Sequence, residues 1–350
     1  MRKIAILAEG RFQVAAAKTA TGVIRYSSDK IVAVIDSTKA GLDAAQALGV
    51  DLGKGIPIVV DINEALSYQP DTLLIGVAPK GGNLPNEWRW QLLKAIENGL
   101  DIINGLHAFL SEDEELQAAA QKQGVLLWDV RLPSHKRIVS SYTPHRAGSH
   151  TILAVGSDCA TGKMTTMLEL NQEAQKRGLI SGFLATGQTG IMISGDGLPV
   201  DHIISDFVAG MVEEKVLAFA SKYDWVFVEG QGALNHPGYS PVTLGLLHGT
   251  LPDAMIFCHQ AGATTIGGYN NCPLPSLSHM IEMNQDAVNW LYPQQKSQVV
   301  GISLITYQLS EAEALDELKR VENETGLPTV DVLRFGPVRL MDVLYNHFSH

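Results

Sequence analysis

The sequence predicts an α/β protein built from two successive parallel sheets, and three observations lead to this fold class. Short apolar runs alternate with longer amphipathic stretches along almost all of the 350 residues. Many of the apolar runs end at glycine or aspartate, as is typical of the short connections in such folds. The alternation is interrupted once, by a polar stretch that follows Asp129. This pattern is typical of doubly wound sheets, whose buried parallel strands are covered by helices on both faces.

The first alternation predicts a Rossmann-like N-terminal domain over residues 1–130. Its buried strands are expected at Ile4–Ala8, Ile31–Asp36, Thr72–Val77, Asp101–Ile103 and Val125–Trp128. Its helices are expected at Phe12–Tyr26, Lys39–Leu48, Pro85–Asn98 and Glu112–Lys122. The first strand leads into AEGRF and not into a GxGxxG loop, so we do not expect NAD to bind. The glycine loop Gly76–Gly82 carries Lys80, a candidate anion partner.

A second alternation predicts a C-terminal domain over residues 151–350, joined to the first by a polar linker at 131–150. Its strands are expected at Ile152–Val155, Ile180–Ala185, Trp225–Glu229, Ala254–His259, Val299–Ile305 and Thr329–Val332. Its helices are expected at Lys163–Arg177, Ser205–Ala220, Ser276–Leu291, Glu311–Glu324 and Pro337–Phe348. The segment Ala185–Phe207 is rich in glycine, threonine and aspartate and is expected to be an active-site loop. In the linker, Arg137 and Arg146 are candidates to hold a substrate carboxylate.

A phosphate-binding loop is predicted where the strand Ile152–Val155 ends, in the sequence GSDCATGKMTT. Backbone N–H groups of a glycine loop and of a helix N-terminus point at an anion, and a lysine at the helix start reaches phosphate oxygens. The usual pattern has four residues between the glycines and a hydroxyl residue directly after the lysine; here five residues intervene and Met164 follows the lysine. The residues predicted to bind the cofactor are Gly156, Ser157, Asp158, Cys159, Ala160, Thr161, Gly162, Lys163, Met164, Thr165 and Thr166.

A carboxylate at the end of another strand is the second chemical signal. The sequence WVFVEGQG delivers Glu229 at the carboxyl end of a buried strand, where ligands sit in open α/β sheets. A carboxylate near a phosphate loop can hold Mg²⁺, and the Thr165 hydroxyl is a second candidate ligand. Because a surface glutamate opening a glycine turn would give the same pattern, the pairing with the phosphate loop is what favours a functional role.

Two histidines are candidate proton-transfer groups. His259 ends a strand in FCHQAG, and His236 lies in the loop that follows Glu229. Histidine has the right pKa to accept a proton from an attacking ammonium, although a single histidine is often structural. Cys159 lies in the phosphate loop, where an acyl-cysteine or a small loop-filling residue would both be compatible. Glu229, His236 and His259 are therefore the predicted catalytic residues.

These motifs resemble two groups of proteins. Over residues 151–240, GSDCATGK and VEGQG resemble the dethiobiotin-synthetase-like branch of P-loop enzymes. That resemblance implies a P-loop NTPase-like domain, with Asp158, Thr165 and Glu229 as metal ligands; Met164 departs from the pattern. The whole chain resembles the D-glutamate N-acetyltransferase-like family, formerly a family of unknown function, through GSDCATGKMTT, FVEGQGAL, CHQAG and INGLHAFLSED. This second resemblance implies acetyl transfer from acetyl-CoA to the amino group of an acidic amino acid.

Composition restricts the partners and the compartment. The net charge of −11 is unfavourable for a nucleic-acid or anionic-membrane surface, so neither partner is expected. No apolar run approaches the roughly 18 residues of a membrane span. The three cysteines have no metal-type spacing, which favours a reducing cytoplasm, and association into a homo-oligomer is left open.

Three functions remain after these arguments. The first is an N-acetyltransferase that uses acetyl-CoA and an acidic amino acid, such as D-glutamate, as a small-molecule substrate. The second is an ATP- and Mg²⁺-dependent ligase that activates another carboxylate, as the dethiobiotin-synthetase resemblance implies. The third is a nucleotide-binding module without turnover, against which Glu229, His236 and His259 weigh. Acetyl-CoA and ATP both carry phosphates, so the phosphate loop alone does not separate the first two functions.

Overall fold

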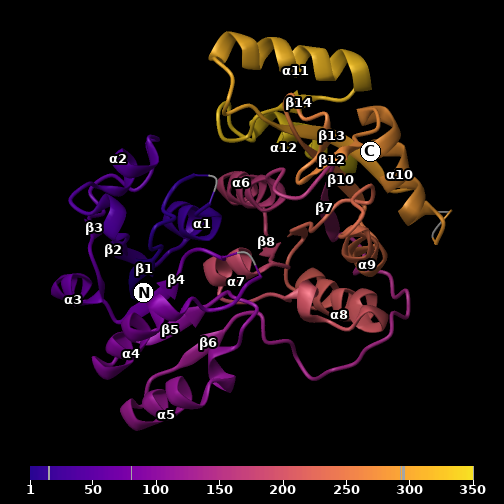
Figure 1. The fold of residues 1–350 in the computed structure, drawn as a ribbon. Helices are drawn as coiled ribbons and strands as arrows, with labels where there is room; N and C mark the ends of the chain where they lie inside the picture. Colours follow the sequence, from indigo (N-terminus) through magenta and orange to yellow (C-terminus); the bar gives the residue numbers. More distant parts are fainter. Residues whose placement is uncertain (15, 80, 292, 294–295, 350) are drawn as a thin grey trace. The chain divides into compact units, whose positions relative to one another are not determined.

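Residues 1–14, 16–79, 81–291, 293 and 296–349 are described by the computed structural model of the protein. They form two compact units, each with its own six-stranded parallel sheet. The first unit contains Met1–Pro133 and Gln188–His202, and the second contains Ser134–Gly187 and Ile203–His350. The predicted α/β class, with helices alternating with parallel strands, is confirmed (Figure 1).

The sheet of the first unit has the strand order β3-β2-β1-β4-β5-β6, which is the order of a Rossmann fold. Its strands are β1 Lys3–Leu7, β2 Lys30–Ile35, β3 Ile58–Val59, β4 Thr72–Ile75, β5 Asp101–Asn104 and β6 Leu127–Asp129. The central strand β1 pairs with β2 on one side and β4 on the other, and four of its five residues are buried. Its α-helices are α1 Lys18–Tyr26, α2 Ala44–Leu48, α3 Ile62–Ala65, α4 Arg89–Glu97, α5 Glu114–Gln123 and α7 Gln188–Ser194. Its 3₁₀ turns are Ser37–Lys39, Leu66–Tyr68, Asn86–Trp88, Leu110–Glu112 and Val200–His202.

The sheet of the second unit has the order β14-β13-β10-β7-β9-β8. Its strands are β7 His150–Gly156, β8 Ser181–Leu184, β9 Trp225–Val228, β10 Ala254–Gln260, β13 Gln298–Ile305 and β14 Thr329–Val330. Its helices are α6 Lys163–Lys176, α8 Val208–Ala220, α9 Ser240–Thr250, α10 Leu277–Asn289, α11 Glu311–Thr325 and α12 Val338–Phe348, with a 3₁₀ turn at Ser205–Phe207. A separate antiparallel pair is formed by β11 Thr265–Ile266 and β12 Tyr269–Pro273. Because β7 lies between β9 and β10, residues at the carboxyl ends of these three strands are neighbours.

The helix expected at Phe12–Tyr26 begins only at Lys18. The preceding residues bond instead to Asp36, whose side chain accepts from the backbone N–H groups of Gly10 at 3.1 Å and Phe12 at 2.9 Å. Asp36 is fully buried, and the Thr38 hydroxyl also donates to it at 2.6 Å. The carboxylate that dinucleotide-binding domains direct at a ribose therefore fastens the loop after β1 in this protein.

The segment Ala185–Phe207, expected to be a loop, contains helix α7 and the 3₁₀ turn Val200–His202. Part of it, Gln188–His202, belongs to the first unit although it follows strand β8 of the second. Within the first unit, the buried hydroxyl groups of Thr19 and Thr189 lie 2.9 Å apart and join α1 to α7. The sequence pattern of glycine and threonine concealed this helix, because both residue types are also typical of loops.

Part of the polar segment expected as a linker is fixed to the second unit by one buried carboxylate. Glu213 on α8 accepts hydrogen bonds from the backbone N–H groups of Ser141 at 2.8 Å and Thr143 at 2.9 Å, and from the Ser140 hydroxyl at 2.5 Å. Burial alone would raise the pKa of Glu213, but these hydrogen bonds lower it to about 2. Because several N–H and O–H groups of this irregular segment donate to one ionised carboxylate, the segment has a defined path.

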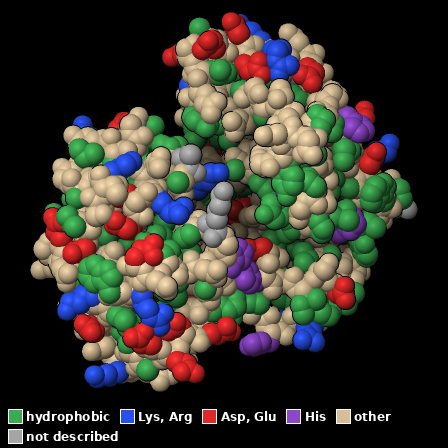
Figure 2. All heavy atoms as spheres, viewed as in Figure 1, with side chains coloured by type: hydrophobic (Ala, Val, Ile, Leu, Met, Phe, Trp, Pro, Cys, Tyr) green, Lys and Arg blue, Asp and Glu red, His purple; other side chains and the backbone are tan. Residues whose placement is uncertain are grey.

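Positive and negative side chains are interspersed over the face of the molecule that Figure 2 shows. No single sign of charge dominates this face, and the excess of acidic residues gives the sequence a net charge of −11. Within the described ranges, none of the helices combines the length and the apolar character that crossing a membrane requires.

Candidate functional site

The predicted phosphate loop lies between strand β7 and helix α6 in the second unit, at the carboxyl edge of the sheet. Glu229 directly follows β9 and His259 is the penultimate residue of β10, so these two residues flank the loop on its two sides. This is the edge at which open α/β sheets bind ligands. Strand order thus brings together three sequence segments that are far apart in the chain.

The backbone of the loop needs two glycines for different reasons. A Cβ atom on Gly156 would lie 2.5 Å from the carbonyl oxygen of Cys258 on the neighbouring strand, so only glycine fits. Gly162 has a φ of 87°, a left-handed conformation that favours glycine, and it precedes the first residue of α6. Ala160 also has a positive φ, 58°, which is uncommon for a residue with a side chain. The loop therefore has a defined and partly strained shape, as is common at ligand sites.

Lys163 is the first residue of α6, and its side chain folds back over the loop. Its ammonium donates to the carbonyl oxygen of Asp158 at 2.7 Å and to the hydroxyl of Thr161 at 3.2 Å. Burial lowers the pKa of Lys163 from its ordinary value. A Cβ on Gly230 would lie 3.0 Å from Cδ of Lys163 and would clash with the Ala154 carbonyl, so Gly230 makes room for this side chain. The lysine is thus positioned inside the loop, where a phosphate would meet it.

The hydroxyl of Ser157 joins the loop to β10, the neighbouring strand in the sheet. The Ser157 Oγ lies 2.8 Å from Nδ1 of His259, and both residues are buried. Burial and the nearby Arg320 lower the pKa of His259 to about 4. The imidazole is therefore neutral at neutral pH, and its contact with Ser157 fixes the start of the loop.

Glu229 is buried beside the loop and is hydrogen-bonded by backbone groups that follow β8. Its Oε2 accepts from the N–H of Thr186 at 2.9 Å and from the N–H of Gly187 at 3.1 Å. Burial raises the pKa of Glu229 to about 7, although these N–H groups, the Gln231 side chain and Lys163 all act to lower it. A carboxyl group with a pKa near neutrality is able to exchange a proton at physiological pH.

His236 approaches the loop from the segment that follows β9. Its Nδ1 accepts from the backbone N–H of Gly238 at 3.0 Å and of Tyr239 at 3.2 Å, which places the proton of the neutral ring on Nε2. That Nε2 lies 3.8 Å from Oδ1 of Asp158. His236 therefore presents an N–H donor to the phosphate loop.

The predicted metal ligands are held in different ways. Asp158 accepts from the N–H of Cys159 at 2.6 Å and of Gly267 at 2.7 Å, so its carboxylate fixes the loop and the β11–β12 turn. The possible ligand atoms of Asp158, Cys159 and His236 all lie within 4.8 Å of one another, a grouping that the sequence did not predict. Thr165 is half-buried on the first turn of α6, as is Met164. These positions leave the metal roles of Asp158, Thr165 and Glu229 as predictions.

Thr166, predicted to contact the cofactor, is buried on the first turn of α6. Its hydroxyl donates to the carbonyl of Gly162 at 3.0 Å and to the Ser303 hydroxyl on β13 at 2.8 Å. It therefore fastens the helix to the sheet, whereas the Lys163 ammonium is bound by the Asp158 carbonyl and the Thr161 hydroxyl of the loop.

Several site residues were not identified from the sequence. Thr186 and Gly187 hold Glu229, and the Asn235 side chain donates to the Ser157 carbonyl at 2.9 Å. Arg146, a candidate for binding a substrate carboxylate, donates to Asp224 at 2.5 Å just before β9, at the amino edge of the sheet. Arg137 is exposed on the segment before β7, and the candidate Lys80 lies outside the described residues.

Comparison with known proteins places this site in a family. Residues 37–133 match the domain of unknown function DUF1611_N, described as Rossmann-like, and residues 139–341 match the domain of unknown function DUF1611_C, described as a P-loop domain. A crystal structure of a DUF1611 family protein from Anabaena variabilis has a TM-score of 0.92 and 38% identity, covering 99% of this chain and all of that one.

Two curated relatives have names that describe an activity. A D-glutamate N-acetyltransferase from Tritonibacter scottomollicae is 40% identical over 330 residues, which is 94% of each chain. A D-glutamate N-acetyltransferase from a Pseudoalteromonas species is 38% identical over 275 residues, covering 79% of this chain and 81% of the relative. Both names agree with the expectation of an enzyme, and the predicted family is confirmed. The chain belongs to the DUF1611 family, with a Rossmann-like N-terminal domain followed by a P-loop C-terminal domain.

Proposed function

We propose that the protein is an N-acetyltransferase that moves the acetyl group of acetyl-CoA to the amino group of an acidic amino acid such as D-glutamate. The observation that carries this proposal is the 40% identity, over 94% of both chains, with a relative named D-glutamate N-acetyltransferase. At this identity and coverage the phosphate loop and its flanking strands belong to the shared part of the two proteins. The identity of the acetyl donor is the part of the proposal that rests on the chemistry of the site.

The phosphate loop supports a donor that carries phosphates. Acetyl-CoA contains a diphosphate and a 3′-phosphate, and the loop offers backbone N–H groups together with the Lys163 ammonium at the start of α6. Lys163 is buried, and its own bonds are to a carbonyl and a hydroxyl within the loop. A bound phosphate would replace these neutral partners by an anion, which strengthens each hydrogen bond.

Glu229 is the base that the geometry favours. The acceptor amino group is an ammonium at neutral pH, so it must lose a proton before it can attack a thioester. Glu229 has a pKa of about 7, next to the phosphate loop, and can accept that proton. The neutral amine then attacks the acetyl carbonyl carbon, a C–N bond forms, the C–S bond breaks, and CoA leaves as a thiol after receiving a proton.

The two histidines support the reaction in different roles. His236 presents Nε2–H toward the loop, which suits it to donate a hydrogen bond to a phosphate, to the developing oxyanion or to the departing sulfur. His259, with a pKa of about 4, is a weak base, and its contact with Ser157 makes it a positioning residue for the loop. The sequence alone had placed all three residues in the same class.

An isothermal titration comparison tests the donor. Acetyl-CoA and ATP with Mg²⁺ are titrated separately into wild-type protein and into Lys163→Ala. We expect acetyl-CoA to bind to the wild type and to lose affinity in the variant. Binding of ATP–Mg²⁺ alone, with ADP released on addition of a carboxylate substrate, would support the ligase alternative and overturn the proposal.

A further inference from the structure

A loop in the first unit carries His107, and several hydrogen bonds fix the backbone around this residue. The loop follows β5, where the Asn104 side chain donates to Asp129 at 2.7 Å across the end of the sheet. The backbone N–H of His107 donates to the Gly82 carbonyl at 2.9 Å, and a Cβ on Gly82 would clash with the His107 ring. Arg131 donates from Nε to the carbonyl oxygen of Gly105 at 2.7 Å. These contacts fix the position of His107 although its side chain is exposed.

A second segment of the same unit brings two more polar side chains to this loop. The 3₁₀ turn Val200–His202 carries Asp201 and His202. Asp201 forms an ion pair with Arg131, whose side chain is buried. The ring of His202 also contacts Phe109, with 5.3 Å between ring centroids. The turn is therefore held in place by a charge on one side and an aromatic ring on the other.

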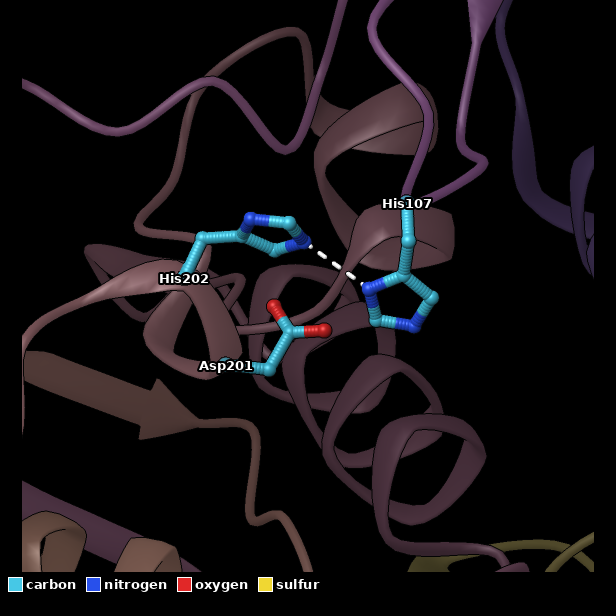
Figure 3. A group of neighbouring side chains, drawn as sticks. All are labelled: His107, Asp201 and His202. Carbon is cyan, nitrogen blue, oxygen red and sulfur yellow. Dashed lines mark hydrogen bonds between the residues drawn. The ribbon is translucent and has the colours of Figure 1, made fainter. Parts of the chain in front are cut away.

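The two histidines meet edge to edge, as Figure 3 shows. Nδ1 of His107 lies 2.9 Å from Nε2 of His202, and the ring planes are inclined by only 25°. The Asp201 carboxylate points toward the space between the rings, and the three ligand atoms lie within 4.8 Å of one another. Residues 95 positions apart in the sequence thus place two nitrogens and an oxygen at one point.

Two imidazole nitrogens 2.9 Å apart cannot both direct a lone pair at each other, because the lone pairs repel, so a proton or a metal ion is required between them. They can share one proton in an N–H···N hydrogen bond, or they can both bind a metal ion. Burial and the charge of Arg131 lower the pKa of both His107 and His202. The neutral ring is the form that binds metals. A carboxylate beside two neutral imidazoles is the donor set of many zinc sites.

The spacing fits a small divalent ion after a modest movement. Zinc–nitrogen bonds of about 2.0–2.1 Å at a tetrahedral angle require nitrogens roughly 3.3–3.4 Å apart. The two rings would therefore separate by roughly 0.4–0.5 Å, which side chains at the surface can accommodate. Arg131 holds the Asp201 carboxylate from outside, as the partners of metal ligands commonly do. One coordination position remains for water.

We propose that His107, Asp201 and His202 form a binding site for a divalent transition metal such as Zn²⁺. Because the site has two nitrogens and only one carboxylate, already paired with Arg131, it selects metals that favour nitrogen over hard cations such as Mg²⁺. The residues of this site belong to the first unit, whereas the phosphate loop belongs to the second. Nothing in the proposed acetyl transfer depends on it.

Metal content is the direct test. The full-length protein is stripped with a chelator, incubated with a small excess of Zn²⁺, desalted and analysed by mass spectrometry for metal per chain. We expect one equivalent in the wild type that His107→Ala and His202→Ala both lose, with at least a roughly tenfold weaker affinity for Zn²⁺. His279→Ala, which removes an exposed histidine on α10, should retain the metal. Mg²⁺ should bind no more tightly to the wild type than to the variants.

Three results would overturn the proposal. Wild-type protein that binds no Zn²⁺ would show that the two rings share a proton only. Metal retained by both His107→Ala and His202→Ala would place the ion elsewhere. Metal lost in His236→Ala but retained in His107→Ala would assign it to Asp158, Cys159 and His236, the other cluster of ligand atoms. Substituting Co²⁺ and recording its visible absorption separates a nitrogen-ligated site from loose surface binding, and circular dichroism without metal verifies that each variant is folded.

Discussion

The hydroxyl of Ser157 lies 2.8 Å from Nδ1 of His259, so a buried hydrogen bond joins the phosphate loop to the end of the neighbouring strand. This contact helps to fix the shape of a loop in which Gly156 packs tightly against β10 and in which Ala160 and Gly162 have positive φ angles. It also separates the two histidines of the site by role: His259 fixes the loop, and His236 points a donor at it. The predictions below follow from this arrangement.

Replacing His259 should weaken donor binding through the loop and not through proton transfer. His259→Ala leaves the buried Ser157 hydroxyl without its partner, so we expect roughly tenfold weaker binding of acetyl-CoA. His259→Asn can restore a hydrogen bond to Ser157 and should recover most of the affinity. The pH dependence of kcat should stay the same in both variants. A shifted pH profile in His259→Asn would show that His259 itself transfers the proton.

Lys163→Ala should reduce affinity for acetyl-CoA by tenfold or more, since each charge-assisted contact contributes roughly 1.5–3 kcal/mol. Calorimetry measures the loss, and Lys176→Ala, an exposed lysine at the other end of the same helix, is the matched control. Equal affinity in Lys163→Ala and the wild type would show that the loop does not hold the phosphates.

Glu229→Gln should abolish most turnover while leaving donor affinity nearly unchanged. In the wild type, kcat/KM should rise with pH through about 7, because Glu229 must be ionised to accept the proton. The variant should lack this rise. Glu282→Gln, on the exposed face of α10, should behave as the wild type. A pH-dependent rise that persists in Glu229→Gln would assign the base to another group.

The same substitution should raise stability at alkaline pH. The pKa of Glu229 is raised from 4.5 to about 7 in the folded protein, so the folded state holds a proton that the unfolded state releases. Stability contributed by this group is therefore full below about pH 4.5 and is lost as pH rises through 7. At pH 8, Glu229→Gln should have a higher free energy of unfolding than the wild type in urea titrations, with the difference shrinking at pH 5. A less stable variant at pH 8 would contradict the burial argument.

Glu213→Ala should destabilise the second unit by roughly 1–3 kcal/mol, because buried N–H groups of the segment before β7 lose their acceptor. The pKa of Glu213 is lowered from 4.5 to about 2, so its contribution is present above about pH 4.5 and is lost as pH falls toward 2. The difference between wild type and variant in urea unfolding should shrink accordingly. Glu214→Ala removes the half-buried neighbour that pairs with the exposed Lys136; it is the control and should cost little.

The strands around the site could be predicted because each is a continuous apolar run ending at a glycine or a polar residue. Which strands lie next to each other in the sheet could not be predicted, because strand order depends on packing between segments that are distant in the sequence. Helix α9 was missed for a specific reason: Gly245 and Gly249 resemble turn residues. They allow close approach to α8, since a Cβ on Gly249 would lie 2.3 Å from the Ala209 carbonyl.

Contacts that depend on three-dimensional structure also escaped sequence reasoning. Thr186 and Gly187 bind Glu229 through backbone N–H groups, which no side-chain pattern reveals. The tautomer of His236 depends on two further backbone donors. The roles predicted for Glu229, His236 and His259 from their positions at strand ends therefore became distinguishable only when their partners were known.

Transfer of a labelled acetyl group tests the central claim most directly. The protein is incubated with acetyl-CoA carrying ¹³C in its acetyl group and with D-glutamate, and the products are analysed by mass spectrometry together with a colorimetric assay of free CoA thiol. The proposed function predicts labelled N-acetyl-D-glutamate and one thiol released for each product formed, with Glu229→Gln inactive in the same assay. Absence of labelled product with D-glutamate and with other acidic amino acids, or ADP formation from ATP as the only turnover, would contradict it.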